Sequence, residues 1–471
     1  MSKQTELAKN TFILTVGKIC TQFLSFFLLP LYTGILTAAE YGTVDIIITY
    51  TTLLTHVVLL GVDQAIFRFL VDVRNDEEGR RRIVTTALLF ALGQILAAAI
   101  IFIPICLAVK SEYTIYLLLN VIASICINMM LQTARGFGDI KGYSFGSFLA
   151  AALQILGNIL LLVAIPLGIR GMLIAMISGN MLAAIYLSLR NRIYKYLSFR
   201  SFSKDMFTRI MKYSLPLVPN ALSWWILQAS DRTIVMLMLG QAMNGQLTVA
   251  HKFSNIFYLI YQIFHMSWME SAALYMDKPN SKQFFSDVVK TMFRFFTSLG
   301  IGIIAILPFV FSILVKGEYT EAYMLVPLLV LSVIGNIVAA LYTVFYTAKK
   351  KTGAIAASSA AAAIINIVVH LLLVPYIGLY AAGVSSIVAF GCMAIYRYID
   401  TGRFIVIKLP ISDVLIFAGM FVVTCIGYYV GTPLVRACVL LADLLICTVM
   451  NMPLLKAVIA AIKKKIGREV R

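Results

Sequence analysis

Long apolar runs recur along the whole chain, and they constrain its fold more than any other feature. A helix needs about 20 apolar residues to cross the hydrocarbon core of a bilayer, and segments of this length follow one another from end to end. Of the 471 residues, 61% are hydrophobic and 13% are charged. A water-soluble protein of this composition would expose apolar patches far larger than soluble proteins carry. The sequence therefore predicts an all-α polytopic membrane protein.

The apolar runs divide the chain into about fourteen expected membrane helices. The first run lacks a small-residue cleavage site, so we expect it to be retained as a helix and not removed as a signal peptide. The expected helices cover residues 10–36, 43–67, 83–108, 114–134, 143–168, 171–190, 214–239, 247–276, 288–315, 320–347, 353–375, 378–400, 412–431 and 433–460.

The basic residues are distributed asymmetrically between the connecting segments. The chain has 39 Lys and Arg against 21 Asp and Glu, a net charge of +18. Most of the basic residues lie at the termini and after every second helix, as in RNDEEGRRR (74–82) and the tail KKKIGREVR (463–471). The intervening loops hold only Lys110, Arg170, Lys316 and Arg436. This asymmetry follows the positive-inside rule and places both termini in the cytoplasm, so the charge reflects topology and not nucleic-acid binding.

The sequence repeats itself at a nearly constant offset. VKSEYT at 109–114 returns as VKGEYT at 315–320, an offset of 206, and Gly168 corresponds to Gly378 at an offset of 210. Asn158 and Asn366 match at an offset of 208. Because six helices separate the copies and six is even, both copies enter the membrane from the same side. The repeat predicts two parallel six-helix lobes with pseudo-two-fold symmetry, followed by two extra C-terminal helices.

This repeat gives the expected domain organisation. Between the lobes we expect a basic, amphipathic cytoplasmic segment, because its mixture of aromatic and basic residues suits the headgroup region of a membrane. The expected parts are an N-lobe (1–190), this linker (191–213), a C-lobe (214–400), helices 13 and 14 (412–460) and a basic cytoplasmic tail (461–471).

Several cations lie inside apolar segments, where a charge is costly. Lys18, with Gln22 one turn later, Arg232 and Lys252 fall on the first and second helices of the two lobes. They predict a water-filled cationic cavity that binds phosphate oxygens by charge-assisted hydrogen bonds. The alternatives are that Arg232, beside Asp231, reaches toward the outer surface, and that Lys252 lies at the membrane interface.

Two adjacent tryptophans, Trp224 and Trp225, are predicted well inside the bilayer, away from the aromatic belts at its edges. Packing between the lobes is the simpler interpretation, and stacking against sugar rings is the alternative. The seven cysteines form no C-x-x-C pair, so neither a metal site nor a disulfide framework is predicted.

The segment FLLPLYTGILTAAEYGTVDIIITYTTLLTHVVLLGVDQAIFRF (27–69) resembles the opening of bacterial oligosaccharide flippases. These belong to the multidrug/oligosaccharidyl-lipid/polysaccharide (MOP) exporter superfamily. The resemblance rests on PLYT, the EYG turn that begins at Glu40, and the close of helix 2 with Asp63 and Arg68. It marks Glu40, Asp63 and Arg68 as structural or gating residues, and Asp45, an ionisable residue near the outer end of the second expected helix, is placed with them.

The resemblance implies a transporter and not an enzyme. Its cargo would be a polyprenyl-pyrophosphate-linked oligosaccharide, the repeat unit of a surface polysaccharide, moved from the inner to the outer leaflet of the bacterial cytoplasmic membrane by alternating access. Lys18 would match a cavity arginine of the related lipid II flippases, and helices 13 and 14 would provide a groove for the lipid tail. Expected partners are membrane lipids and the glycosyltransferases and polymerase of the same pathway, and we expect a monomer without a cofactor.

In those relatives a sodium site joins helices 7, 11 and 12. The matching positions are Asp231, Asn366, His370 and Ser386, with histidine where a carboxylate is expected. Hard cations prefer oxygen ligands, whereas imidazole exchanges protons near neutral pH. The coupling ion is therefore expected to be H⁺ in place of Na⁺, or the membrane potential drives transport alone.

Four alternatives remain open at this point. The spacing D-x-x-G-R-R in residues 76–81 occurs in major-facilitator transporters, although fourteen helices exceed the usual twelve there. A multidrug or other small-molecule exporter of the same superfamily is the second. A membrane glycan polymerase or ligase is the third, but the expected outer loops are short and offer no paired carboxylates or nucleophile–base set. A scaffold without cargo is the fourth, and the charged cavity residues disfavour it.

Overall fold

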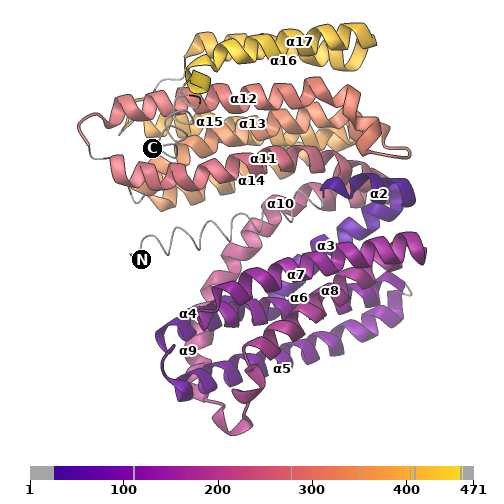
Figure 1. Cartoon of the computed structure of the whole chain (residues 1–471), viewed down its shortest axis with the longest axis vertical. Coiled ribbons are helices and arrows are strands. Elements are labelled where there is room, and N and C mark those ends of the chain that lie inside the picture. The colour runs from indigo at the N-terminus through magenta and orange to yellow at the C-terminus, as the bar shows by residue number, and fades with distance from the viewer. Residues whose placement is uncertain are drawn as a thin grey trace, which may run out of the picture. The chain divides into compact units, whose positions relative to one another are not determined.

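The computed structural model describes residues 26–109, 112–276, 278–349, 351–403, 405–407, 410–456 and 459 (Figure 1). These residues form helices and short connections, and no strand occurs among them. Eleven of the described helices are long and apolar enough to cross a membrane. The chain divides into two compact units, Met1–Gly245 and Gln246–Arg471, and each is described by itself.

The eleven spans coincide with eleven of the fourteen predicted helices. Most of the predicted helix 10–36 lies outside the described residues, and its end is helix α2. The other two predicted helices are present as α10 and α11, of 22 and 35 residues. Both are long enough to span, but they carry polar and charged side chains such as Asp231, Arg232 and Lys252 along their length. The chain is thus a multi-pass membrane protein.

The first unit contains helices α2 to α10 and the beginning of α11. Its elements are α2 (Leu29–Ile35), α3 (Ala38–Leu59), α4 (Val62–Asp72), α5 (Glu77–Val109), α6 (Glu112–Gly136), α7 (Ile140–Ile159), the π-helix η1 (Leu160–Ala164), α8 (Gly168–Arg190), the 3₁₀ turns η2 (Ile193–Lys195) and η3 (Phe199–Ser201), α9 (Lys204–Ser214), η4 (Leu215–Leu217), α10 (Val218–Leu239) and the start of α11 (Gln241–Tyr275).

One predicted helix, 43–67, is two helices in the structure, so this expectation was wrong. Leu60 and Gly61 both adopt left-handed backbone angles, with φ of 50° and 73°, and this break separates α3 from α4. Glycine is the residue that takes such a conformation without steric cost. The start was also placed too late, because the side chains and backbone of Thr37 and Glu40 form a capping box that begins α3 at Ala38.

The core of the first unit lies where α3, α4, α5 and α6 meet. Two apolar residues of the predicted linker, Ile193 and Ile210, are buried in the same core. The linker is therefore structured: it consists of η2, η3 and α9, and the hydroxyl of Thr85 on α5 donates to the carbonyl of Tyr196 at 2.6 Å. Its helix α9 has opposite apolar and charged faces.

The second unit contains the rest of α11 and the helices that follow it. These are α12 (Ser281–Leu314), α13 (Thr320–Ala348), α14 (Thr352–Ile377), α15 (Tyr380–Thr401), α16 (Ile411–Val430) and α17 (Pro433–Met450). Helix α12 contacts α16 and α17, and an aromatic cluster of Trp268, Phe285 and Phe345 joins α11, α12 and α13. Helix α17 ends at Met450, ten residues before the predicted end at 460, and after a turn at Asn451 residues 452–456 are helical again, with Pro453 in their first turn.

The internal repeat is visible within each unit. In the first, α8 packs against both α6 and α7; in the second, α15 packs in the same way against α13 and α14. The matched glycines also agree in conformation, because Gly168 and Gly378 have φ of 57° and 55°. Gly168 is the first residue of α8, and Gly378 lies two residues before the start of α15. A backbone conformation that favours glycine thus recurs at the predicted offset.

Candidate functional site

A buried ion pair joins α10 to α3 in the first unit. Asp45 and Thr49 lie one turn apart on α3, so their side chains share a face. Arg232 of α10 reaches both: its Nε lies 3.3 Å from Oδ2 of Asp45, and its Nη1 donates to Oγ1 of Thr49 at 3.3 Å. The side chain of Asp45 is 10% exposed and that of Arg232 24%. A carboxylate on the facing helix therefore balances a cation at membrane depth.

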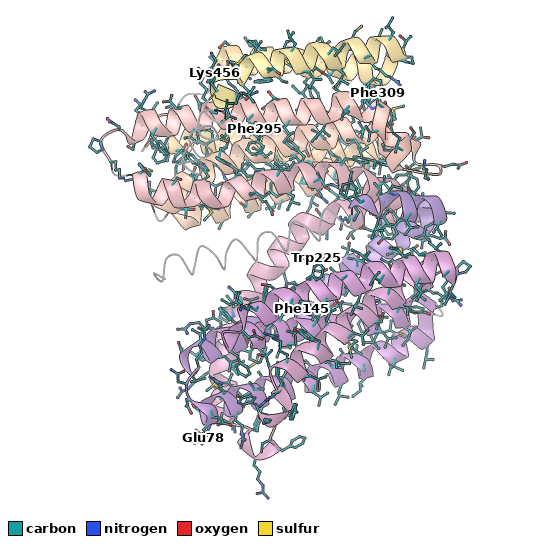
Figure 2. The ribbon with its side chains drawn as sticks, in the orientation of Figure 1. Glu78, Phe145, Trp225, Phe295, Phe309 and Lys456 are labelled. Carbon is teal, nitrogen blue, oxygen red and sulfur yellow. The ribbon has the colours of Figure 1, made fainter. Side chains whose placement is uncertain are left out.

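An aromatic pair extends this site along α10. Trp225 lies seven residues before Arg232, about two turns away on the same face of the helix. Its indole N–H donates to the backbone carbonyl of Thr49 at 2.9 Å, and its ring lies 5.9 Å from that of Tyr50. Figure 2 shows the position of Trp225 on α10. Thr49 thus accepts from both residues of α10. The site consists of Asp45, Thr49 and Tyr50 from α3 and Trp225 and Arg232 from α10.

The ion pair is loosely made. Nε of Arg232 and Oδ2 of Asp45 are both buried, and neither has a hydrogen-bond partner despite their proximity. A guanidinium offers five N–H donors in a planar fork. Buried polar atoms that stay unsatisfied require an explanation, and an exchangeable partner at a binding site is one. The arrangement can bind an anion by replacing or supplementing the carboxylate of Asp45.

The predicted structural residues of the opening segment are accounted for by local contacts. Glu40 accepts from the backbone and hydroxyl of Thr37 at 2.8 and 2.9 Å. Asp63 lies in the first turn of α4 and accepts from Gln64 at 3.1 Å. Arg68 pairs with Asp72 at 2.6 Å on an exposed face of α4. Of the four residues in this group, only Asp45 belongs to the buried ion pair.

The structure describes only some of the other residues that were predicted to line the cavity. Lys18 and Gln22 lie outside the described residues, as does the side chain of Trp224, whose backbone belongs to α10. Asp231 is half-buried on α10 directly before Arg232. Lys252 is half-buried on α11 and belongs to the second unit.

The predicted ion-coupling residues of the second unit lie on two packed helices. The amide of Asn366 on α14 donates to the hydroxyls of Ser385 and Ser386 on α15, at 3.3 and 3.1 Å. His370 lies one turn after Asn366 on α14 and is fully buried. The structure therefore brings Asn366 and Ser386 together, with Ser385 beside them. Within the described ranges no three His, Cys, Asp or Glu side chains come together in a group that could hold a metal ion.

One buried cation escaped the sequence reasoning. Arg397 on α15 is only 4% exposed, and it donates to the hydroxyls of Ser358, Ser359 and Thr343 at 3.0, 2.8 and 2.6 Å. It fastens the ends of α13, α14 and α15 to one another. Arg397 lies near a helix end, where a charge usually reaches water, and the signal that could have found it was the Ser358-Ser359 pair inside the neighbouring apolar segment.

The sequence reasoning also missed an ion pair that connects α12 to α16. The guanidinium of Arg294 binds the carboxylate of Asp413 with two hydrogen bonds of 2.5 and 2.8 Å. Asp413 is almost completely buried. A bidentate pair of this kind anchors the two extra C-terminal helices to the second unit.

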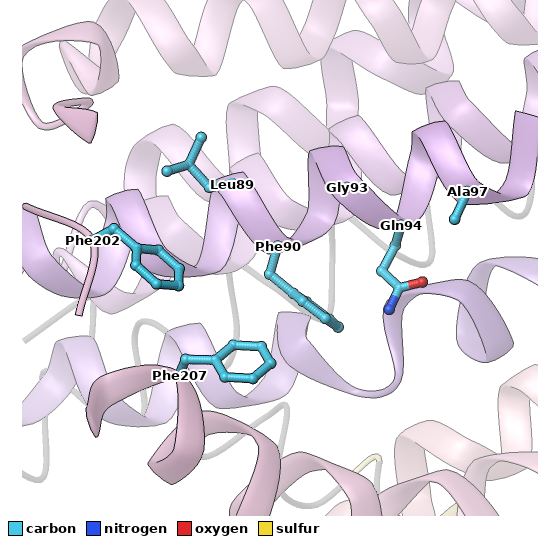
Figure 3. Close-up of a pocket in the computed structure, with 7 residues that line it drawn as sticks. All are labelled: Leu89, Phe90, Gly93, Gln94, Ala97, Phe202 and Phe207. Carbon is cyan, nitrogen blue, oxygen red and sulfur yellow. The ribbon is translucent and has the colours of Figure 1, made fainter. Parts of the chain in front are cut away.

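An apolar groove of about 400 Å³ lies on the first unit between α5 and the linker (Figure 3). Phe90 of α5 and Phe207 of α9 form its walls, with ring centroids 5.4 Å apart. Gln94 is the only strongly polar residue that lines it. Only 6% of the membrane-length window of α5 is buried, so the groove continues a largely uncovered apolar surface of this helix.

Comparison with known proteins identifies the family. The profile described as "Polysaccharide biosynthesis protein" matches residues 7–269, more than half of the chain. The chain belongs to the polysaccharide biosynthesis protein family. The matched range includes the resembling segment 27–69 and all five residues of the ion-pair site. No curated protein matches the sequence significantly.

Solved structures show the same fold. The lipid II flippase MurJ in an inward closed conformation has a TM-score of 0.68, with 16% identity over 94% of this chain and 100% of that chain. An inward-facing multidrug resistance MATE family transporter of the MOP superfamily has a TM-score of 0.64, with 12% identity over 82% and 94%. A MOP superfamily transporter from Pyrococcus furiosus Vc1 has 0.55, with 13% over 84% and 95%. These likenesses confirm the predicted fold class.

Proposed function

We propose that this member of the polysaccharide biosynthesis family is a flippase for a polyprenyl-pyrophosphate-linked oligosaccharide. It would move the cargo from the inner to the outer leaflet of a bacterial cytoplasmic membrane, with both termini cytoplasmic. The family assignment and a fold shared with a lipid II flippase support this proposal. The cargo would leave for polymerisation by other enzymes of the same pathway, so the chain itself is a transporter.

The loosely paired Arg232 is the observation that carries the proposal. A pyrophosphate needs cationic donors when it leaves water, because an uncompensated anion in hydrocarbon is very costly. Arg232 combines a mostly buried guanidinium with a hydroxyl and a carboxylate that bind it weakly. An incoming phosphate can take over these donors with charge-assisted hydrogen bonds. Asp45 would then neutralise Arg232 in the empty state.

The aromatic half of the site fits the saccharide. Trp225 and Tyr50 belong to the same site as Arg232: the indole N–H of Trp225 donates to the backbone carbonyl of Thr49, and the two rings lie 5.9 Å apart. Sugar rings present C–H faces that aromatic side chains cover well. A pyrophosphate on Arg232 would thus place the first sugar near the two rings.

Leaflet-specific labelling of the lipid-linked saccharide tests this function. In proteoliposomes with the cargo loaded in one leaflet, we expect Arg232→Gln to slow transfer about 10–100-fold, because a charge-assisted hydrogen bond contributes about 1.5–3 kcal/mol. Arg209→Gln is the matched control, since Arg209 forms an exposed ion pair with Asp205 on α9. Equal transfer by Arg232→Gln and the control would remove the proposed role of the site. Transfer of a cationic drug in place of the saccharide would favour the exporter alternative.

We propose further that transport is coupled to protons or to the membrane potential. Of the candidate coupling residues, those in the second unit are Asn366, whose amide donates to the hydroxyls of Ser385 and Ser386, and His370 one turn away, while Asp231 lies on α10 in the first unit. A histidine at this position favours proton exchange over sodium binding.

A further inference from the structure

A polar cavity of about 420 Å³ lies at the end of the first unit where its basic segments gather. It opens between the start of α5 and the turn that leads from α8 into the linker. Its wall contains four cations, Arg80, Arg190, Arg192 and Lys195, with Tyr196 and one carboxylate, Glu77. The ion-pair site on α3 and α10 contributes no residue to this cavity.

Contacts with the protein position two of these cations, Arg80 and Arg190. Arg80 lies 5.3 Å from the centroid of the Phe137 ring, and its Nη1 donates to the hydroxyl of Tyr196 at 3.4 Å. Its Nε is buried without a hydrogen-bond partner. Arg190 is held by two hydrogen bonds to Asp139, of 2.6 and 3.0 Å. A partly buried guanidinium with an unsatisfied nitrogen, beside an aromatic ring, is a site that can accept an anion.

The backbone also holds the remaining cations at the cavity. Arg192 has a left-handed φ of 51°, a conformation that L side chains rarely adopt, and it turns the chain from α8 into η2. The buried Ile193 anchors this turn in the core of the unit. Arg192 and Lys195 are exposed and lie on either side of this anchor. The segment thus presents two cations from a fixed position.

The surroundings of the cavity indicate where an anion would come from. Beside the cations, the same segment exposes Tyr194, Leu197 and Phe199, the last with 84% of its surface accessible. Aromatic and aliphatic side chains of this kind enter the interfacial layer of a bilayer, while basic residues beside them meet the headgroups. The neighbouring α5 exposes its apolar length to hydrocarbon. The cavity is therefore at headgroup depth.

We propose that this cavity binds the phosphate group of an anionic membrane lipid in the leaflet that it faces. Basic pockets between helices at this depth recognise phosphate headgroups, and Arg and Lys supply charge-assisted hydrogen bonds to the phosphate oxygens. Glu77 is the one carboxylate in the wall, and Asp139 outside the wall pairs with Arg190, so Arg80, Arg192 and Lys195 are the cations left to meet a phosphate. A bound headgroup would hold the linker against α5.

Native mass spectrometry of the full-length protein in detergent tests this site. The probes are phosphatidylglycerol, phosphatidylcholine and inorganic phosphate, each titrated separately. We expect selective retention of phosphatidylglycerol, and about a tenfold or greater loss of that retention in the double variant Arg192→Gln/Lys195→Gln. The matched control is Arg200→Gln/Lys204→Gln, which removes two exposed charges from the same linker outside the cavity. It should change retention by less than about threefold.

Three outcomes would overturn the proposal. An equal loss in the cavity variant and the control would mean that the lipid responds to overall charge. Equal retention of phosphatidylcholine would mean that phosphate charge is not selected, and equal binding of inorganic phosphate would assign the cavity to a free anion. If the double variant is unstable, the single variants Arg192→Gln and Lys195→Gln replace it, each with a smaller expected loss. Arg232→Gln should keep full lipid retention, which separates this inference from the proposed transport function.

Discussion

Nε of Arg232 on α10 and Oδ2 of Asp45 on α3 lie 3.3 Å apart, both buried, without a hydrogen bond between them. Removing one partner of such a pair leaves an uncompensated charge, which is far costlier than losing an exposed pair. Some of that cost is relieved because Arg232 retains 24% of its side-chain exposure. We therefore expect the pair to contribute to stability, and in the proposed function Asp45 is the partner that an incoming anion would replace.

We predict that Asp45→Asn lowers the free energy of unfolding by about 1–3 kcal/mol. Thermal unfolding in detergent would measure this loss. Asp205→Asn is the control, since it breaks an exposed pair with Arg209 and should change stability by about 0.5 kcal/mol or less. The double variant Asp45→Asn/Arg232→Gln should recover part of the stability, because no buried charge is left alone. A double variant less stable than Asp45→Asn would contradict the pairing.

A second prediction concerns the contact between α3 and the start of α11 within the first unit. A Cβ on Gly42 would meet backbone atoms of Gln241 and Gly245, and the amide of Asn244 donates to the carbonyl of Gly42 at 2.9 Å. Gly42→Ala should therefore destabilise the protein by about 1–3 kcal/mol through overpacking. Gly302→Ala on α12 is the control, because its Cβ would meet open space. It should be neutral or stabilise by up to about 1 kcal/mol, and equal effects of the two variants would refute the close approach.

The fold was largely predictable because apolar length and charge asymmetry act locally along the chain. Eleven predicted helices recur as membrane spans, and the repeat offset correctly paired Gly168 with Gly378. The Leu60–Gly61 break was not foreseen, since glycine also occurs inside continuous helices such as α5 and α12. Whether a glycine bends a helix depends on its packing partners, here Ser214 and Leu217 beside Gly61.

The candidate site was predictable only by residue type. Apolar flanks singled out Arg232 and Asp45, but nothing local showed that residues 187 positions apart would pair. The predicted loop 240–246 was wrong, because α11 begins at Gln241 and Asn244 is held by Gly42. Arg397 and Asp413 were overlooked because both lie near helix ends, where charges usually reach water. Their burial depends on the hydroxyls and on Arg294 of neighbouring helices.

A third prediction concerns Arg397. Lysine at this position would keep the charge but would lose the planar fork that reaches three hydroxyls on two helices. We expect Arg397→Lys to lower stability by about 1–3 kcal/mol, as at least one buried hydroxyl partner is lost. Unfolding in detergent measures this, with Arg403→Lys as the control, since Arg403 is 79% exposed in its pair with Asp400. A loss no larger than that of the control would show that the fork is not required.

A fourth prediction concerns the pH dependence of stability at Asp139, outside the membrane spans. The hydrogen bond from Arg190, together with that from the backbone N–H of Gly142, holds the pKa of Asp139 below its usual value. A lowered folded pKa contributes stability above the unfolded pKa of about 3.9, and this contribution is lost as the pH falls through the folded value. Asp139→Asn should therefore cost up to about 1 kcal/mol at neutral pH, since Arg190 is 40% exposed.

The pH profile of unfolding separates the charge of Asp139 from its capping role. Asn can still accept from the N–H of Gly142, so the variant removes mainly the ion pair. The difference in Tm between the two proteins should be constant from pH 8 to about 5 and should shrink below about pH 4. A difference that stays constant down to the most acidic pH at which the protein folds would assign the effect to the cap.

The last prediction concerns His370, which is fully buried on α14 one turn after Asn366. If this imidazole carries the coupling proton, the rate of saccharide transfer in proteoliposomes should depend on an imposed pH gradient, and His370→Ala should abolish that dependence. Replacing Na⁺ by K⁺ should leave the wild-type rate unchanged. His56→Ala is the control, because His56 on α3 is exposed and bonds only its own helix, through Thr52. Transfer by His370→Ala with an unaltered response to the gradient would exclude proton coupling at this residue and leave the membrane potential as the driving force.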